Sequence, residues 1–160
     1  VAHIHYVLFG GAVFGIMAGI YYWFPKMTGR FLSRKLGIWH FWVQLIGFNL
    51  TFFPMHFLGL SGMPRRIADY AAGRGWTGLN TVATLGAYVI AVSMILLFVN
   101  VWVSLRRPRD AAADAWEGGS SLEWATASPP PEHNFDVVPE VRSFRPVYDA
   151  RVAASGGEVR

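Results

Sequence analysis

Three long stretches of the chain contain no aspartate, glutamate, lysine or arginine. They are Val1–Pro25, Leu36–Pro64 and Leu79–Leu105. Each is longer than the about 20 apolar residues that an α-helix needs to cross a bilayer. A membrane β-strand would alternate apolar and polar residues, whereas the third stretch is apolar on every face. The sequence therefore predicts an all-α membrane protein with three transmembrane helices. We expect these helices at about residues 1–25, 36–58 and 79–105.

The distribution of charge separates this hydrophobic part from the rest of the chain. Residues 1–105 contain seven basic residues and one acidic residue, and residues 106–160 contain seven basic and nine acidic residues. Positive charge beside membrane spans reports orientation, so the net charge of +4 does not indicate a nucleic-acid partner. Gly, Ser, Pro and acidic residues are frequent after residue 105. We therefore expect residues 106–160 to form an extended polar tail without a core of its own.

The basic residues that flank the apolar stretches predict the orientation. They are Lys26, Arg30, Arg34 and Lys35 between the first two stretches, and Arg106, Arg107 and Arg109 after the third. By the positive-inside rule, both groups are cytoplasmic in a bacterial cell. We therefore expect a multi-pass protein of the bacterial inner membrane with a cytoplasmic C-terminal tail. Because the chain starts inside an apolar stretch and without methionine, we expect its first helix to begin upstream of Val1.

Two consecutive arginines depart from this pattern on the opposite side of the membrane. Arg65 and Arg66 follow the second apolar stretch, and Asp69 is the nearest counter-charge. An excess of positive charge at this position indicates an anionic ligand or partner, because adjacent guanidinium groups bind carboxylates and phosphates through several N–H donors. Heme propionates and lipid phosphates both satisfy this chemistry, and simple snorkelling to the headgroup region explains the pair as well.

Two histidines near the N-terminus are the candidate metal ligands. His3 and His5 are two residues apart, so in a helix their side chains diverge by about 200°. They cannot easily share one metal, but each can face a separate cofactor, an arrangement that suits two hemes on either side of one helix. Two neutral histidines that hydrogen-bond across a helix bundle explain the same spacing. The chain has no cysteine, which excludes thiolate metal sites.

Four other polar residues of the second stretch have structural interpretations. His40 and His56 are sixteen positions apart, about 24 Å along a helix, so they cannot share a site. We expect each to be interfacial or structural. Gln44 and Asn49 are candidates for buried amides that hydrogen-bond to neighbouring helices.

Two segments carry a family resemblance. They are Val1–Leu8, with the sequence VAHIHYVL, and Thr51–Arg66, with the sequence TFFPMHFLGLSGMPRR. In this order and spacing they closely resemble the C-terminal part of subunit I of bacterial heme–copper cytochrome c oxidases, and the similarity spans residues 1–105. The resemblance implies that the three helices are the last three of a twelve-helix core. It also implies that the chain must be completed by helices that precede it in relatives.

The resemblance assigns roles to the four candidate site residues. By position, His3 matches the proximal ligand of the high-spin heme, where oxygen is reduced. His5 matches an axial ligand of the low-spin heme, and Arg65 and Arg66 match arginines that bind heme propionates. Both hemes are expected to be heme A. In relatives the copper ligands, the second ligand of the low-spin heme and the entrances of the main proton channels lie upstream, so copper is expected to bind outside this chain.

The function implied by the resemblance is that of the catalytic subunit of a terminal respiratory oxidase. Such an oxidase passes electrons from cytochrome c to oxygen and couples this reaction to proton pumping. The implied partners are the rest of subunit I, oxidase subunits II and III, cytochrome c and the lipid bilayer. Two alternatives remain open: a membrane heme-binding electron carrier without oxygen chemistry, and a structural membrane subunit. Quinol oxidases share the architecture, so the electron donor follows from the resemblance alone.

Overall fold

The computed structural model describes residues 1–137, 139–141 and 143–156, and within these ranges it contains helices and loops but no strand. The chain forms two compact units. The helical unit combines Val1–Gly19 with Ser33–Trp102. The tail unit combines Ile20–Leu32 with the described residues from Val103 onward. The prediction of an all-α protein is therefore confirmed.

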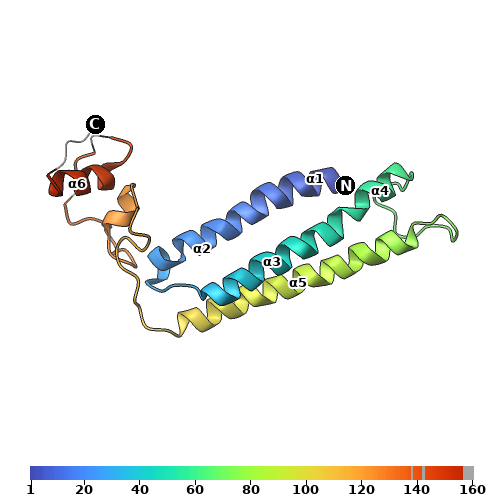
Figure 1. The fold of residues 1–160 in the computed structure, drawn as a ribbon, viewed down its shortest axis with the longest axis horizontal. Helices are drawn as coiled ribbons and strands as arrows, with labels where there is room; N and C mark the ends of the chain where they lie inside the picture. Colours follow the sequence, from blue (N-terminus) through green and yellow to red (C-terminus); the bar gives the residue numbers. More distant parts are fainter. Residues whose placement is uncertain (138, 142, 157–160) are drawn as a thin grey trace. The chain divides into compact units, whose positions relative to one another are not determined.

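Among the described residues, three helical spans are long and apolar enough to cross a membrane, as the sequence predicted. The first is continuous from Ala2 to Thr28 and consists of α1 (Ala2–Val7), the π-helix η1 (Leu8–Val13) and α2 (Phe14–Thr28). The second consists of α3 (Arg34–Phe52) and α4 (Pro54–Leu60), and the third is α5 (Thr77–Leu105). The first span ends later than predicted, at Thr28, the second extends beyond both of its predicted bounds, and the third begins earlier, at Thr77. Figure 1 shows the parts of these spans that belong to the helical unit running along one common direction.

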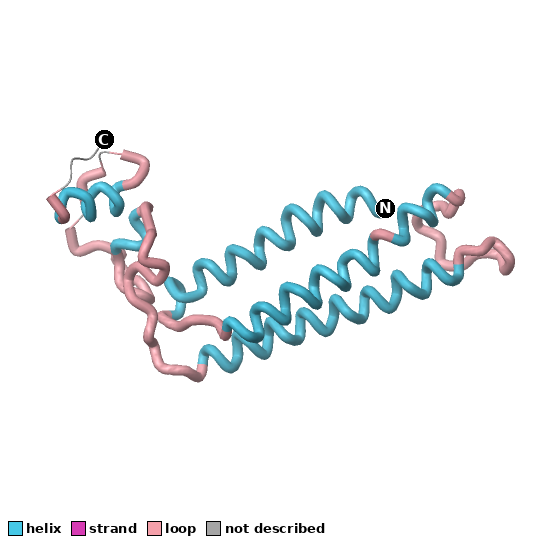
Figure 2. Tube along the Cα trace, viewed as in Figure 1, coloured by secondary structure: helices cyan, strands magenta, loops and turns pink. Residues whose placement is uncertain are grey.

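Two local features divide the first and second spans. Phe53 separates α3 from α4, and Figure 2 shows this break as a short loop segment. Pro54 follows it as the first residue of α4, because proline has no N–H to continue the hydrogen bonding of the preceding turn. In the first span, η1 contains Gly10 and Gly11 and begins one residue after α1 ends with Val7. Single π-helical turns of this kind occur frequently at functional sites.

Helices α3 and α5 pack closely through glycine and buried polar residues. A β-carbon on Gly86 would lie 2.6 Å from Oγ1 of Thr51, so the two backbones approach each other at this point. Further along, the buried hydroxyl of Ser93 donates a hydrogen bond to Oε1 of buried Gln44. The predicted role of Gln44 as a buried amide that bonds to a neighbouring helix is therefore confirmed.

The other end of this helix pair is held by two reciprocal hydrogen bonds. The Ser33 N–H, just before α3, donates to Oδ1 of Asn100 over 2.8 Å, and Nδ2 of Asn100 donates to the Ser33 carbonyl over 3.1 Å. Asn100 is fully buried in α5. Ser33 pairs with Asn100, and Gln44, later in the chain, pairs with Ser93, which is earlier than Asn100. The two pairs therefore fix an antiparallel register between α3 and α5.

The tail unit is organised around a buried lysine. Lys26 was expected in the loop between the first two spans, but α2 continues to Thr28 and places Lys26 in its last turn. Its side chain is 5% exposed. Its ammonium nitrogen donates to the carbonyl oxygens of Ala113 (2.8 Å), Thr126 (2.7 Å) and Ala127 (3.3 Å), and lies 5.4 Å from the ring centroid of Trp124. The end of the first span and the tail therefore share one core.

The described part of the tail contains two short helices that were not predicted from the sequence. They are the 3-10 helix η2 (Leu122–Ala125) and α6 (Pro146–Ala154). Trp124 of η2 is 2% exposed, and Tyr22 packs edge-on against it with the ring centroids 5.2 Å apart. Tyr22 also stacks on Trp116, so residues of Ile20–Leu32 supply aromatic contacts to the tail within this unit.

Candidate functional site

His5 is held by two contacts within the helical unit. Its imidazole ring stacks on Phe52 of α3, with the ring centroids 4.4 Å apart and an interplanar angle of 16°. Its Nδ1 atom lies 2.9 Å from the carbonyl oxygen of Val1, one helical turn earlier. The side chain is half-buried. The ring therefore has a defined plane against α3.

The hydrogen bond to Val1 determines which nitrogen of His5 is available to a metal. A carbonyl oxygen only accepts hydrogen bonds, so Nδ1 must be the protonated nitrogen. In a neutral imidazole, Nε2 then carries the lone pair. Metal-bound histidines commonly donate their other ring N–H to a backbone carbonyl in this way. The residues around His5 thus fit an imidazole that ligates heme iron through Nε2.

His3 lies on a different side of α1. It is exposed, and in the described part of the chain no hydrogen bond, ion pair or ring contact involves it. The helical geometry of Ala2–Val7 thus separates the two histidines, as their spacing predicts. The structure does not bring His3 and His5 together at one point, and a search of the described residues finds no group of three or more His, Asp or Glu side chains that could hold a metal ion.

Tyr6 and Asn49 form a contact beside His5 that sequence reasoning only half anticipated. The Tyr6 hydroxyl donates a hydrogen bond of 2.8 Å to Oδ1 of Asn49. The predicted interhelical role of Asn49 is therefore confirmed, although its side chain is exposed in the helical unit and not buried. Tyr6 was not a candidate, because nothing in a linear sequence shows that it faces α3. Its position next to His5 was the available signal.

Arg65 and Arg66 lie in the exposed loop between α4 and α5. Arg66 has a φ of +62°, a conformation that few non-glycine residues adopt. Within the described ranges, neither guanidinium makes a hydrogen bond or an ion pair, and the Asp69 carboxylate accepts the N–H of Tyr70. Figure 1 shows this loop at the same end of the helical unit as the start of α1. Two cations without a counter-charge fit an anionic ligand.

The remaining histidines of the second span lie apart, as expected. His40 is 3% exposed in α3, whereas His56 of α4 places Nδ1 3.2 Å from the carbonyl oxygen of Phe53. The ring of His56 also lies 5.4 Å from that of Tyr6, between centroids.

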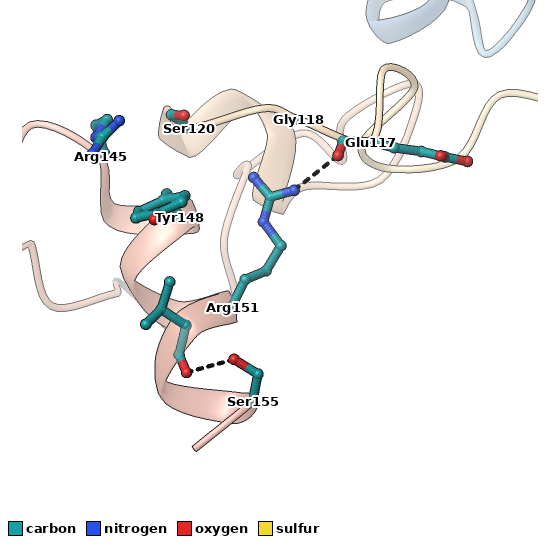
Figure 3. Close-up of a pocket in the computed structure, with 8 residues that line it drawn as sticks. Glu117, Gly118, Ser120, Arg145, Tyr148, Arg151 and Ser155 are labelled. Atoms are coloured by element: carbon teal, nitrogen blue, oxygen red, sulfur yellow. Dashed lines mark hydrogen bonds between the residues drawn. The ribbon is translucent and has the colours of Figure 1, made fainter. Parts of the chain in front are cut away.

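An open pocket of about 610 Å³ lies in the tail unit (Figure 3). Arg151 occupies one wall and is already engaged, since it pairs with Asp114 at 3.3 Å and donates to the carbonyl of Glu117 over 3.2 Å. Arg145 stacks on Tyr148, with its guanidinium carbon 4.5 Å from the ring centroid. None of the predicted site residues lines this pocket.

Comparison with known proteins places the chain in a family. The family described as cytochrome C and quinol oxidase polypeptide I matches residues 1–89. The probable cytochrome c oxidase subunit 1-beta of Nocardia farcinica is 52% identical over 150 residues, which are 93% of this chain and 26% of that protein. Cytochrome c oxidase subunit 1 of Corynebacterium diphtheriae is 49% identical over 93% of this chain and 27% of its own length. Quinol oxidase subunit 1 of Bacillus spizizenii is 49% identical over 89% of this chain and 22% of its own length.

The chain thus spans about a quarter of the length of the relatives it matches. The matched region contains both histidines of α1 and both arginines of the loop after α4. Since the family match covers more than half of the chain, and the relatives align with nearly all of it, the chain belongs to the family of cytochrome c and quinol oxidase polypeptide I.

Proposed function

We propose that the chain supplies one axial ligand to each of two hemes in a terminal respiratory oxidase. His5 ligates the low-spin heme and His3 ligates the high-spin heme at which oxygen is reduced. The observation that carries this proposal is the hydrogen bond from Nδ1 of His5 to the Val1 carbonyl, which leaves Nε2 as the metal-binding atom. The different directions of His3 and His5 support two separate hemes instead of one shared metal.

The arginine pair contributes charge to the same centre. Arg65 and Arg66 bind heme propionates, since a guanidinium forms short, charge-assisted hydrogen bonds to a carboxylate. The absence of an internal ion pair at either residue in the described part of the chain leaves both available for this role. Neutralising the propionates makes burial of the negatively charged heme edge less costly.

The residues of α1 provide a short electron path across one helix. Bound heme A supplies the one-electron chemistry that amino-acid side chains lack. The chain's own part is to hold His5 and His3 on different sides of the same helical turn, with Ile4 between them. With both hemes bound, His5 and His3 would hold them on different sides of α1, where they would supply the electron transfer from cytochrome c to oxygen that is coupled to proton pumping.

The apolar surface supports a position inside a larger membrane complex. In the most apolar stretch of the first span only 6% of the residues are buried, and in those of the second and third spans 39% and 22% are buried. The proposed neighbours are the rest of subunit I, which holds the copper, oxidase subunits II and III, and the bilayer. The complex lies in the bacterial inner membrane with the tail in the cytoplasm.

The test uses the purified complete oxidase with His5→Ala or His3→Ala. We expect His5→Ala to lose the low-spin heme absorption bands and His3→Ala to lose those of the high-spin heme. His133→Ala is the matched control, because His133 is exposed in the tail. Unchanged heme content in both ligand variants would overturn the proposal. Metal analysis tests the oxidase assignment separately: copper alongside heme supports it, whereas heme alone favours an electron carrier.

A further inference from the structure

The hydrogen bond between Tyr6 and Asn49 has a fixed direction. Nδ2 of Asn49 donates to the carbonyl oxygen of Leu45 over 2.9 Å, which determines how the amide is turned. Oδ1 is then the atom that faces Tyr6, at 2.8 Å, and because Oδ1 can only accept, the tyrosine hydroxyl must donate. The contact therefore joins α1 to α3 through one defined donor and one defined acceptor.

The same face of α3 also contacts His5, the residue before Tyr6. Phe52, three positions after Asn49 and therefore on the same side of α3, stacks on the ring of His5. The Tyr6 ring also packs against Phe48, with centroids 4.6 Å apart, and against His56 of α4. Two consecutive residues of α1 are thus held by α3, one through stacking and one through a hydrogen bond.

This pair of contacts fixes the rotation of α1 about its axis. The stack with Phe52 sets the plane of the His5 ring but allows it to slide, whereas the Tyr6 hydrogen bond has a narrow range of length and angle. The π-helical turn η1 begins two residues after Tyr6. Because the hydrogen-bond pattern changes there from i→i−4 to i→i−5, the turn that carries His5 and Tyr6 does not form one regular α-helix with α2.

We propose that Tyr6 and Asn49 are positioning residues for the axial ligand His5. Their hydrogen bond fixes the rotation of the first turn of α1 and with it the direction in which Nε2 of His5 points, while Phe52 sets the plane of the ring. The inference rests on the proposed role of His5 as ligand of the low-spin heme. Outer contacts of this kind tune a metal centre by orienting its ligand, without touching the metal.

The experiment measures the low-spin heme itself in the complete, purified oxidase with Tyr6→Phe. This variant keeps the ring that packs on Phe48 and His56 and removes only the hydroxyl. We expect unchanged heme content, together with a shift of the low-spin electron paramagnetic resonance g values, the visible absorption band and the midpoint potential. Asn49→Leu should shift the same quantities in the same direction. The double variant should shift them no further than a single one, because both changes break one interaction.

A matched control and a second variant make each result decisive. Tyr88→Phe removes a hydroxyl from a tyrosine that is 67% exposed on α5 and should leave all three quantities at their wild-type values. Wild-type g values, absorption band and potential in Tyr6→Phe would overturn the inference. If Tyr6→Phe does not assemble, Asn49→Leu is measured in its place. Shifted g values, absorption band and potential then support the inference, and wild-type values overturn it.

The same measurements separate failure of this inference from failure of the proposed function. If His5→Ala keeps its low-spin heme, the ligand assignment is wrong and the positioning role falls with it. If His5→Ala loses the low-spin heme while Tyr6→Phe and Asn49→Leu match the wild type, the ligand assignment stands and only the positioning role is wrong.

Discussion

The ammonium nitrogen of Lys26 lies 2.7 Å from the carbonyl oxygen of Thr126, one hundred positions later in the chain. The carbonyl oxygens of Ala113 and Ala127 accept from the same nitrogen, so the three donors of the ammonium group each have a backbone acceptor. A buried charge is tolerated when it is fully hydrogen-bonded. Lys26 therefore ties the last turn of α2 to two segments of the tail, around Ala113 and around Thr126.

Replacing this lysine should loosen the tail unit. Lys26→Met keeps most of the apolar stem but removes hydrogen bonds from a charged donor, each of which contributes about 1.5–3 kcal/mol. A loss of about 3 kcal/mol would raise the population of the opened tail by about 100-fold. We expect trypsin to cleave between Arg151 and Val152 faster by a similar factor in the purified complex, as followed by mass spectrometry.

The control for this prediction is Lys35→Met, which also removes one lysine but at an exposed position at the start of α3. Its tail should be cleaved at the wild-type rate. Equal cleavage rates in Lys26→Met and the wild type would show that the three carbonyl contacts do not hold the tail.

A single added methyl group should separate α3 from α5. In Gly86→Ala the new β-carbon would lie 2.6 Å from the Leu50 carbonyl carbon and 2.6 Å from Oγ1 of Thr51. Because part of this contact is backbone, side-chain rotation cannot relieve it, and overpacking of this kind costs about 1–3 kcal/mol. We expect a lower temperature for the loss of helical circular dichroism in the purified complex.

Gly78→Ala is the matched control on the same helix. A β-carbon on Gly78 would meet no atom of the described residues within 4 Å, and alanine is the better helix former. Its transition temperature should equal or exceed that of the wild type. Equal transition temperatures in Gly86→Ala and the wild type would contradict the close approach of the two helices.

Neutralising either loop arginine should weaken heme retention. Arg65→Gln and Arg66→Gln each remove a cation that has no internal partner in the described part of the chain. A hydrogen bond to a charged group contributes about 1.5–3 kcal/mol. Loss of one such bond to a propionate should therefore weaken heme binding by about 10-fold or more. The measurement is the fraction of heme retained by the detergent-solubilised complex as temperature rises.

Arg74→Gln serves as the control, because Arg74 lies in the same loop and stacks on Trp76, with its guanidinium carbon 5.8 Å from the ring centroid. It should retain heme as the wild type does. Wild-type heme retention in both Arg65→Gln and Arg66→Gln, together with less co-purified anionic lipid, would assign the pair to lipid phosphate instead.

Much of the helical unit could be predicted from the sequence because it depends on local properties. Long stretches without charge predict membrane helices, since each helix satisfies its own backbone hydrogen bonds. The divergence of His3 and His5 follows from the residues per turn alone. The interhelical hydrogen bonds of Gln44 and Asn49 were expected because an amide in an apolar span needs a partner, although the partners themselves were not predicted.

The rest depended on which residues meet in three dimensions. No pattern in the sequence pairs Tyr6 with Asn49, because the two residues are 43 positions apart and each has many polar alternatives. Lys26 was expected among the basic residues that report orientation, and only its three distant acceptors account for its burial.

The sequence by itself thus predicted that this chain lies in a membrane, that it contributes three spans, and which residue types can ligate heme. These properties depend only on residues that are close in sequence, through their hydropathy, their charge and the number of residues per helical turn. The tertiary structure alone decided that Phe52 stacks on His5 and that α3 holds the first turn of α1 through Asn49. Such contacts arise between segments far apart in sequence, where a small change in helix rotation determines which atoms meet.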